Sequence, residues 1–406
     1  MRRDRSLPLE IGLLLSFLLA PVFFGSIPAW ASLALSALLF LLLFLYPEAV
    51  SKTRDLPRIF SVGMTLLLGL LLVEFFFSSA NRHATGVELI KWLAFAAAFL
   101  LIQLLPSSSI TRLMTALVFL GAFESLYGLF QVGTGKEKVL WQAKQEHLGF
   151  VTGTYFNRNH LAGLLELCLG VHLGILLGAV KERNLKAVLG WASLWVITLI
   201  GFFQTGSRMG IASFTLSFLI LSIGILKNSW RMDRLFLLFP VLFLGMAFFF
   251  GHHTLSLRWE DLTDNFQNWD GGRILVWKDA LEILRDHPWW GTGLGSFEWI
   301  FPFYQSEKLL LGWNHAHNGY LELALEMGIP GFLVCMASFI YLGAILFRRF
   351  ILDTFSYPLL WGGLISIFSF ALHGLTDFNF SVPANVLIFI LIMGMSFRLT
   401  DSYERG

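Results

Sequence analysis

Residues 29–46 read AWASLALSALLFLLLFLY, a stretch that contains no charged side chain. A helix rises about 1.5 Å per residue, so a segment of this length crosses most of a hydrocarbon core of about 30 Å. Because no water reaches the backbone in hydrocarbon, each amide must be satisfied within its own segment, which favours a helix over a strand. The stretch therefore predicts an integral membrane protein built from α-helices.

Comparable apolar stretches recur along all 406 residues. We expect one all-α polytopic membrane domain over residues 1–406, with about 12 transmembrane helices. The first span lacks a convincing small-residue cleavage site and precedes many others, so we expect a permanent helix rather than a signal peptide. The predicted spans are 7–24, 29–46, 59–77, 87–105, 110–132, 160–180, 187–203, 209–226, 235–251, 319–347, 358–374 and 382–399.

Basic residues predict how the chain is oriented. With an even number of spans both termini lie on one side, and the positive-inside rule makes the side rich in Lys and Arg the cytoplasm. The net charge of +2 thus reflects orientation, and it predicts no nucleic-acid partner. The basic clusters on that side are Arg2-Arg3-Arg5, Lys52-Arg54-Arg58, Lys181-Arg183-Lys186, Lys227-Arg231-Arg234 and Arg348-Arg349.

The longest polar interval, from Gly251 to Tyr320, is predicted to face outward. In a chain that is 56% hydrophobic and 14% charged, short turns would connect the spans equally well, so this loop at 252–318 is expected to hold the chemistry. It contains a segment with apolar and charged faces, typical of a helix lying along a membrane surface. The apolar face carries Ile274, Trp277, Leu281 and Leu284, and the charged face carries Lys278, Glu282 and Arg285.

Two arginines lie at positions where a positive charge calls for an explanation. Arg208 lies between two apolar runs with Gly206 and Gly210 beside it, at the start of a predicted helix whose N-terminus favours an anion. Arg273 begins the amphipathic segment, where the helix dipole slightly disfavours a cation. Arg208 could also simply snorkel to the interface. The alternative interpretation is that Arg208 binds an anion, and the cation at Arg273 suggests a purpose other than starting a surface helix.

His315 and His317 precede Asn318 at the outer start of an apolar run. A histidine near its ordinary pKa of about 6.5 suits the removal of a proton from a hydroxyl group. A helix cap or a metal ligand are the alternatives. The chain has no D-x-D triplet and no obvious third ligand, so we predict no metal and no other cofactor.

Further polar residues face the same predicted compartment. Arg158, Asn159 and His160 open one span from the outside, either as interface anchors or as part of a site. His373 and Asp377 end another span, where a structural His–Asp hydrogen bond is the simpler explanation. Together with the arginines, these residues place the chemistry-bearing groups at one end of the bundle.

Two other features carry less information. Residues 291–297 read GTGLGSF, which resembles a phosphate-binding loop but lacks its Gly-Lys-Ser/Thr ending and a preceding strand, so a flexible turn is expected. Cys168 and Cys335 lie inside predicted spans, where packing explains them better than a disulfide or a metal.

Five ordered pieces resemble the O-antigen ligase and polymerase superfamily, bacterial inner-membrane glycosyltransferases with a C-type fold. The order, spacing and shared side of these pieces carry the resemblance. The pieces are GTYFNRNH at 153–160, TGSR at 205–208, GR at 272–273 with Trp277, AHNGYL at 316–321 with Glu326-Met327-Gly328, and DFN at 377–379.

The resemblance implies transfer of a glycan from undecaprenyl pyrophosphate to an acceptor hydroxyl at the periplasmic face, with inversion and without a metal. It implies that Arg208 and Arg273 hold the pyrophosphate and that His317 deprotonates the acceptor, with His315 as the competing base. Guanidinium groups suit this, since they are permanently charged and bind phosphate oxygens in pairs. The other predicted substrate-binding residues are Arg158, Asn159, His160, His315, Asn318 and Asp377.

The acceptor stays open at this stage. Lipid A core would make the protein a ligase, a second lipid-linked glycan a polymerase, and a protein serine an oligosaccharyltransferase; we favour the ligase, with the polymerase next. From a different class, a flippase would need polar residues along its whole path, whereas the cytoplasmic halves of the predicted spans are nearly uncharged. The expected partners are the lipid-linked donor, lipid A core or a glycan acceptor, and membrane lipid.

Overall fold

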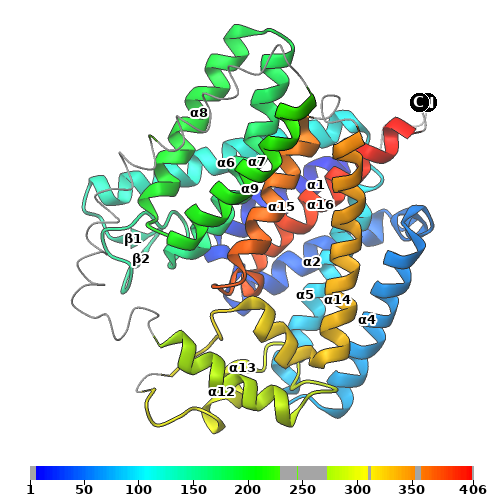
Figure 1. Cartoon of the computed structure of the whole chain (residues 1–406), viewed down its shortest axis with the longest axis vertical. Coiled ribbons are helices and arrows are strands. Elements are labelled where there is room, and N and C mark those ends of the chain that lie inside the picture. Colours follow the sequence, from blue (N-terminus) through cyan, green and yellow to red (C-terminus); the bar gives the residue numbers. More distant parts are fainter. Residues whose placement is uncertain (1–5, 229–244, 246–271, 310–311, 353–357, 405–406) are drawn as a thin grey trace.

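The computed structural model describes residues 6–228, 245, 272–309, 312–352 and 358–404, and these form a bundle of helices (Figure 1). The chain is an all-α membrane protein, as predicted. Within the described residues, seven helices are long and apolar enough to cross a membrane. They are α4 (Arg58–Phe77), α5 (Arg82–Ile102), α6 (Ser107–Gly133), α7 (Arg158–Lys181), α8 (Leu185–Gln204), α14 (Gly319–Leu352) and α16 (Pro383–Glu404).

Four other apolar helices fill the remaining described spans. Helix α2 passes the same test only together with a segment at Glu48–Asp55, across a bend of 81°, and the others are shorter. The predicted span at 235–251 lies outside the described residues, apart from Gly245, so the number of twelve spans stays a prediction. These helices are α1 (Ser6–Val22), α2 (Ala29–Leu45), α9 (Arg208–Asn228) and α15 (Pro358–His373).

Short elements connect the bundle. Between the helices lie a two-stranded antiparallel hairpin, several 3-10 turns and short helices, together with one longer helix, α12. Their bounds are η1 (Phe24–Ser26), α3 (Glu48–Ser51), η2 (Lys52–Asp55), β1 (Lys138–Val139), β2 (Gln142–Ala143), α12 (Arg273–Asp286), α13 (Phe297–Ile300), η4 (Phe301–Phe303) and η5 (Asn379–Ser381).

The centre of the bundle is the packing of α7 against α15. Small residues allow the two backbones to approach closely: a Cβ added at Gly174 would stand 2.7 Å from the carbonyl oxygen of Pro358. Ser366 on α15 adds a hydrogen bond of 2.7 Å to the carbonyl of Leu167 on α7. Close packing through small residues is common between membrane helices. It fixes the two helices relative to each other.

The two terminal helices share one end of the bundle. Glu10 near the start of α1 accepts two hydrogen bonds of 2.6 Å from Arg112 in α6, and Arg398 near the end of α16 donates to the carbonyl of Leu105. The loops with the predicted site residues lie at the other end, where α12 and α13 are drawn at the bottom of Figure 1. Both ends of the described chain are thus opposite the candidate site.

Helix α12 is packed on one stripe and exposed on another. Val276, Ala280 and Ile283 are fully buried, whereas Ile274 and Leu281 of the predicted apolar face are exposed. The sequence pattern identified an amphipathic helix, but the buried stripe runs beside the predicted one. Helix α12 therefore packs against the protein through one apolar stripe and leaves further apolar surface exposed.

Helix α14 is broken inside the span predicted at 319–347. Gly328 has φ +67° and ψ 168°, and Pro330 has no N–H group to continue the ladder. The Ile329 N–H donates instead to the carbonyl of Pro288, at 2.8 Å. The break separates a short first segment, which carries part of the site, from the long membrane helix.

The loop at 291–297 is a turn held by the protein's own acceptors. The Leu294 N–H donates to the carboxylate of Glu74 at 2.7 Å, and the Phe297 N–H donates to that of Glu326 at 3.2 Å. Thr292 and Gly293 donate to backbone carbonyls of α14. Since these N–H groups are already used, the loop is unsuited to cradle a phosphate.

Candidate functional site

A cavity of about 60 Å³ lies where α7, α9, α12 and the turn after α15 meet. It brings together five residues predicted as site residues from four distant parts of the sequence. Its lining also includes neutral groups and one histidine that the sequence interpretation treated as structural. The lining residues are Arg158, Asn159, Ser207, Arg208, Met209, Arg273, His373, Thr376 and Asp377.

A larger cavity of about 440 Å³ lies between α4, α5, α14 and α16. Its walls are mostly Leu, Phe and Met side chains, and the polar groups in its lining are those of Thr53, Arg54, Ser61 and Thr65, with the Trp92 indole. An apolar crevice of this kind suits hydrocarbon, whereas bond-making chemistry needs fixed charges and a proton acceptor. The smaller, charged cavity is the candidate site.

Arg208 is presented at the start of α9. The Ser207 hydroxyl caps this helix by accepting a bond of 3.4 Å from the Gly210 N–H, and the Ser207 N–H donates to Thr205 Oγ1 at 3.3 Å. The first N–H groups of a helix have no partner within it, and they carry partial positive charge. Arg208 and this helix end together favour an anion in the cavity.

Arg158 shapes the same turn. Its Nη1 donates to the carbonyls of Thr205 and Gly206 at 3.1 and 2.9 Å, and its guanidinium lies 4.4 Å from the centre of the Phe150 ring. The residue lines the cavity, yet its visible contacts hold the backbone that presents Arg208. Direct binding of substrate by Arg158 stays a prediction.

Arg273 reaches the cavity from the first position of α12. Its Nη1 donates to the carbonyl of Thr376 at 2.9 Å, and Gly272 before it has φ +85°, a conformation that favours glycine. Trp277 one turn later donates to the carbonyl of Ala316 at 2.9 Å. One helix thus holds both the second arginine and the backbone between the two candidate histidines.

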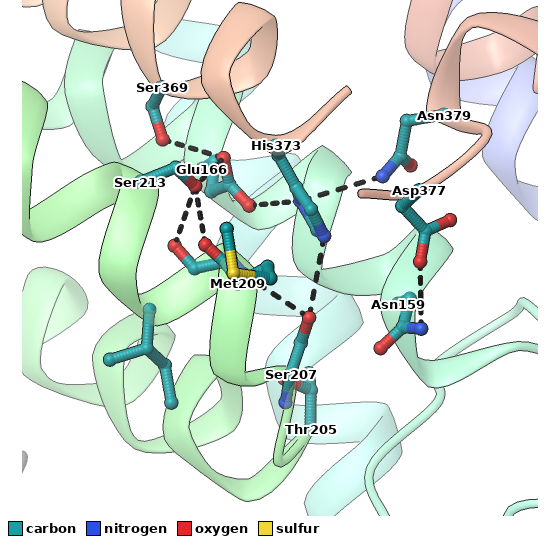
Figure 2. Close-up of polar contacts among 12 residues, drawn as sticks. Asn159, Glu166, Thr205, Ser207, Met209, Ser213, Ser369, His373, Asp377 and Asn379 are labelled. Carbon is teal, nitrogen blue, oxygen red and sulfur yellow. Dashed lines mark hydrogen bonds and ion pairs between the residues drawn. The ribbon is translucent and has the colours of Figure 1, made fainter. Parts of the chain in front are cut away.

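Asp377 pairs with Asn159, whose amide donates to Oδ2 at 2.8 Å. Burial would raise the pKa of Asp377, but the neighbouring His373, together with Arg273 and other basic groups, lowers it below its ordinary value. The expected hydrogen bond between His373 and Asp377 is wrong. His373 pairs instead with Glu166 of α7, as Figure 2 shows.

Three imidazoles surround the ring of Phe378. Ring centres lie 4.7 Å away for His160, 4.2 Å for His315 and 4.7 Å for His317. Phe378 therefore stands where the three side chains would have to converge on an ion. Over the described part of the chain, no three His, Cys, Asp or Glu residues are grouped as metal ligands. Independence from a metal stays a prediction.

His315 forms a dyad with a carboxylate. Its Nδ1 lies 2.7 Å from Oε1 of Glu322, which also accepts from the Ser381 hydroxyl, while the other oxygen accepts from the Ala316 N–H. Burial would lower the pKa of His315, but the charge and hydrogen bond of Glu322 raise it above its ordinary value. Nε2 is left as the nitrogen that can act on a substrate.

His317 has the opposite environment. Burial, and after it the charge of Arg273, lowers the pKa of His317 from 6.5 to about 4, although Asp377 opposes this. Its Nδ1 is buried and has no hydrogen-bond partner among the described residues. At neutral pH this ring is therefore uncharged and able to accept a proton.

Asn318 and Gly319 explain part of the motif at 316–321 by structure. The Asn318 side-chain oxygen accepts from the N–H groups of Tyr320 and Leu321, both at 3.1 Å, as a helix N-cap does. A Cβ added at Gly319 would stand 2.5 Å from the Phe380 ring. Asn318 thus caps α14, and its predicted contact with substrate stays a prediction.

The sequence interpretation missed the two carboxylate partners, Glu166 and Glu322. Each lies in a mostly apolar helix, which is itself a signal, because a carboxylate at membrane depth needs a partner or a function. Both partners turned out to be histidines. His373 was noted, but its partner was assigned wrongly.

The fold and the site define a polytopic membrane protein with a charged cavity and two histidines at one end of its bundle. Residues 193–336 match the family model described as O-antigen ligase. The matched segment contains Arg208, Arg273, His315 and His317, and the match supports the resemblance to the O-antigen ligase and polymerase superfamily that the motifs indicated. A comparison with curated proteins finds no match.

Proposed function

We propose that the protein is a glycosyltransferase that moves a glycan from a lipid pyrophosphate to an acceptor hydroxyl. The observation that carries this is the convergence of Arg208, Arg273 and the N-terminus of α9 on one cavity. Breaking the bond between sugar and pyrophosphate leaves negative charge on the pyrophosphate. Fixed cations placed where that charge develops stabilise the transition state most effectively.

His317 is the proposed base. The acceptor oxygen bonds to the anomeric carbon, the carbon–oxygen bond to phosphate breaks with its electron pair on the pyrophosphate, and the acceptor proton moves to the imidazole. A base of pKa about 4 is weak, but an anion bound at Arg273 offsets the charge that lowers this pKa. Donor binding would therefore strengthen the base beside it.

The competing base is His315, which the Glu322 carboxylate orients and makes more basic. Carboxylate–histidine dyads are a common arrangement for general bases. Against it, its ring stacks on Phe378 at an interplanar angle of 11°, whereas the charge of Arg273 acts on His317. We therefore keep His317, on which the charge of Arg273 acts, as the proposed base.

For the donor we propose undecaprenyl pyrophosphate, and for the acceptor lipid A core, which makes the protein an O-antigen ligase. A polymerase or a protein oligosaccharyltransferase would use the same donor site. The basic clusters support an inner-membrane protein with both termini in the cytoplasm and a periplasmic site. A flippase is less well supported, because the charged cavity lies at one end of the bundle.

The test uses purified protein in lipid nanodiscs with an undecaprenyl-pyrophosphate-linked glycan. Separate reactions add lipid A core, no further acceptor, or a serine-containing peptide, and the products are read by mass. A glycan on lipid A core is expected; longer lipid-linked glycan would indicate the polymerase, and a glycopeptide the oligosaccharyltransferase. Bound donor without transfer to any acceptor would contradict the proposal.

A further inference from the structure

Glu166 is fully buried in α7 and held by three hydroxyl or imidazole groups. Its Oε1 lies 2.6 Å from Nδ1 of His373, and its Oε2 accepts from the hydroxyls of Ser369 at 2.6 Å and Ser213 at 3.4 Å. The partners come from α15 and α9, as Figure 2 shows. The carboxylate therefore joins three helices directly behind the cavity.

A role in packing alone does not account for this pair. Burying two ionisable groups carries a large desolvation penalty, and apolar residues of similar volume often stabilise a protein as well or better. Helices α7 and α15 already pack closely through their glycines and the Ser366 hydrogen bond. Ionisable residues kept inside membrane helices are more often functional. The orientation of His373 indicates which function the pair serves.

The second nitrogen of His373 faces the cavity. Its Nε2 has one weak contact, 3.5 Å from the Ser207 hydroxyl, and both residues line the cavity with Arg208 and Arg273. Nδ1 is held much more closely by Glu166. A hydrogen bond made by one imidazole nitrogen fixes the orientation of the ring and determines whether the other nitrogen carries a proton. The His373 ring is therefore held through Nδ1 by Glu166, and its Nε2 is available to a molecule in the cavity.

We propose that His373, oriented by its contact with Glu166, is a further catalytic residue that donates its Nε2–H to the leaving pyrophosphate beside Arg208 and Arg273. The proton stays on the imidazole, so the contact supplies a hydrogen bond without a change in the balance of the transfer. The inference rests on the proposed donor. The other charged groups that line the cavity are Arg158, which donates to the carbonyls of Thr205 and Gly206, and Asp377, which accepts from Asn159.

The test measures binding of undecaprenyl pyrophosphate that carries no sugar, in nanodiscs, so that neither glycan nor acceptor matters. His373→Gln and Glu166→Gln are each expected to weaken binding roughly 10- to 100-fold, the range for a lost hydrogen bond to a charged group. The double variant should lose about as much as either single one, because both act through one contact. Thermal unfolding of each variant monitors the fold.

His172→Gln is the matched control. His172 is also buried in the bundle, on α7, but its Nε2 is paired with the carbonyl of Trp191 at 2.8 Å and it does not line the cavity. Its substitution should leave binding unchanged. If a folded His373→Gln or Glu166→Gln variant binds as tightly as the wild type, or if His172→Gln weakens binding equally, the proposal is wrong. A wild-type protein that fails to bind the lipid would instead overturn the proposed function itself.

Discussion

The two candidate bases predict different dependences of the reaction on pH. The pKa of His317 is lowered from 6.5 to about 4, a difference worth about 3 kcal/mol between its charged and neutral forms. The pKa of His315 is raised above its ordinary value by Glu322. A base works only when it is unprotonated, so kcat/KM falls as the pH drops through the pKa of the base in the free enzyme.

With His317 as the base, kcat/KM should hold from neutral pH and fall only near pH 4. With His315 as the base, it should already fall above pH 6.5. The anion bound at Arg273 raises the pKa of His317, so the acid limb of kcat should lie at higher pH than that of kcat/KM. The same order is not expected for His315, whose pKa is governed by Glu322.

The assay is transfer of a labelled glycan from the lipid-linked donor in nanodiscs, over a pH series, for the wild type, His315→Gln and His317→Gln. We expect His317→Gln to abolish transfer and His315→Gln to retain it. An acid limb above pH 6.5 in the wild type, with activity lost only in His315→Gln, would refute the assignment. Full activity in both variants would remove histidine from proton transfer.

Three further predictions concern charge, capping and stability. Arg208→Lys and Arg273→Lys should each lower the transfer rate by about 10² to 10³, because a point charge does not reproduce the planar guanidinium; Arg285→Lys, on the exposed face of α12, should have no effect in the same assay. Asn318→Ala should cost about 1 kcal/mol of stability in thermal unfolding while transfer persists, since the side chain caps α14; complete loss of transfer at normal stability would make it a substrate ligand. Between pH 6.5 and 4, His317 becomes protonated in the unfolded chain but not in the folded protein. As the pH falls through this range, the wild type should therefore lose up to about 3 kcal/mol of its free energy of unfolding, a loss that His317→Gln does not share. The difference between the denaturation curves of the two proteins measures it.

The sequence was sufficient for features that depend on local patterns. Apolar length predicted membrane helices, and α9 and α12 begin at Arg208 and Arg273, where a helix start and an amphipathic segment were expected. The prediction that several loops face the same side of the membrane indicated that distant motifs meet at one end of the helix bundle. The cavity lined by Arg208, Arg273 and Asp377 agrees with this. Such predictions succeed because hydrocarbon length and helix termini impose the same requirement wherever they occur.

Features that depend on tertiary contacts could not be predicted in this way. The sequence shows carboxylates in apolar helices, but not that Glu166 lies beside His373 or Glu322 beside His315. The break at Gly328 also depends on a distant loop, which takes over the backbone hydrogen bonds of α14. In each case the partner is far along the chain, and only the packed bundle determines it.

The central claim is that the cavity between Arg208 and Arg273 binds the pyrophosphate of a lipid carrier. The most direct measurement is an electron cryomicroscopy structure of the protein in nanodiscs with undecaprenyl pyrophosphate bound. We expect density for two phosphates between these guanidinium groups, with the N-terminus of α9 and His373 beside them. Phosphate density elsewhere, with this cavity empty, would contradict the account.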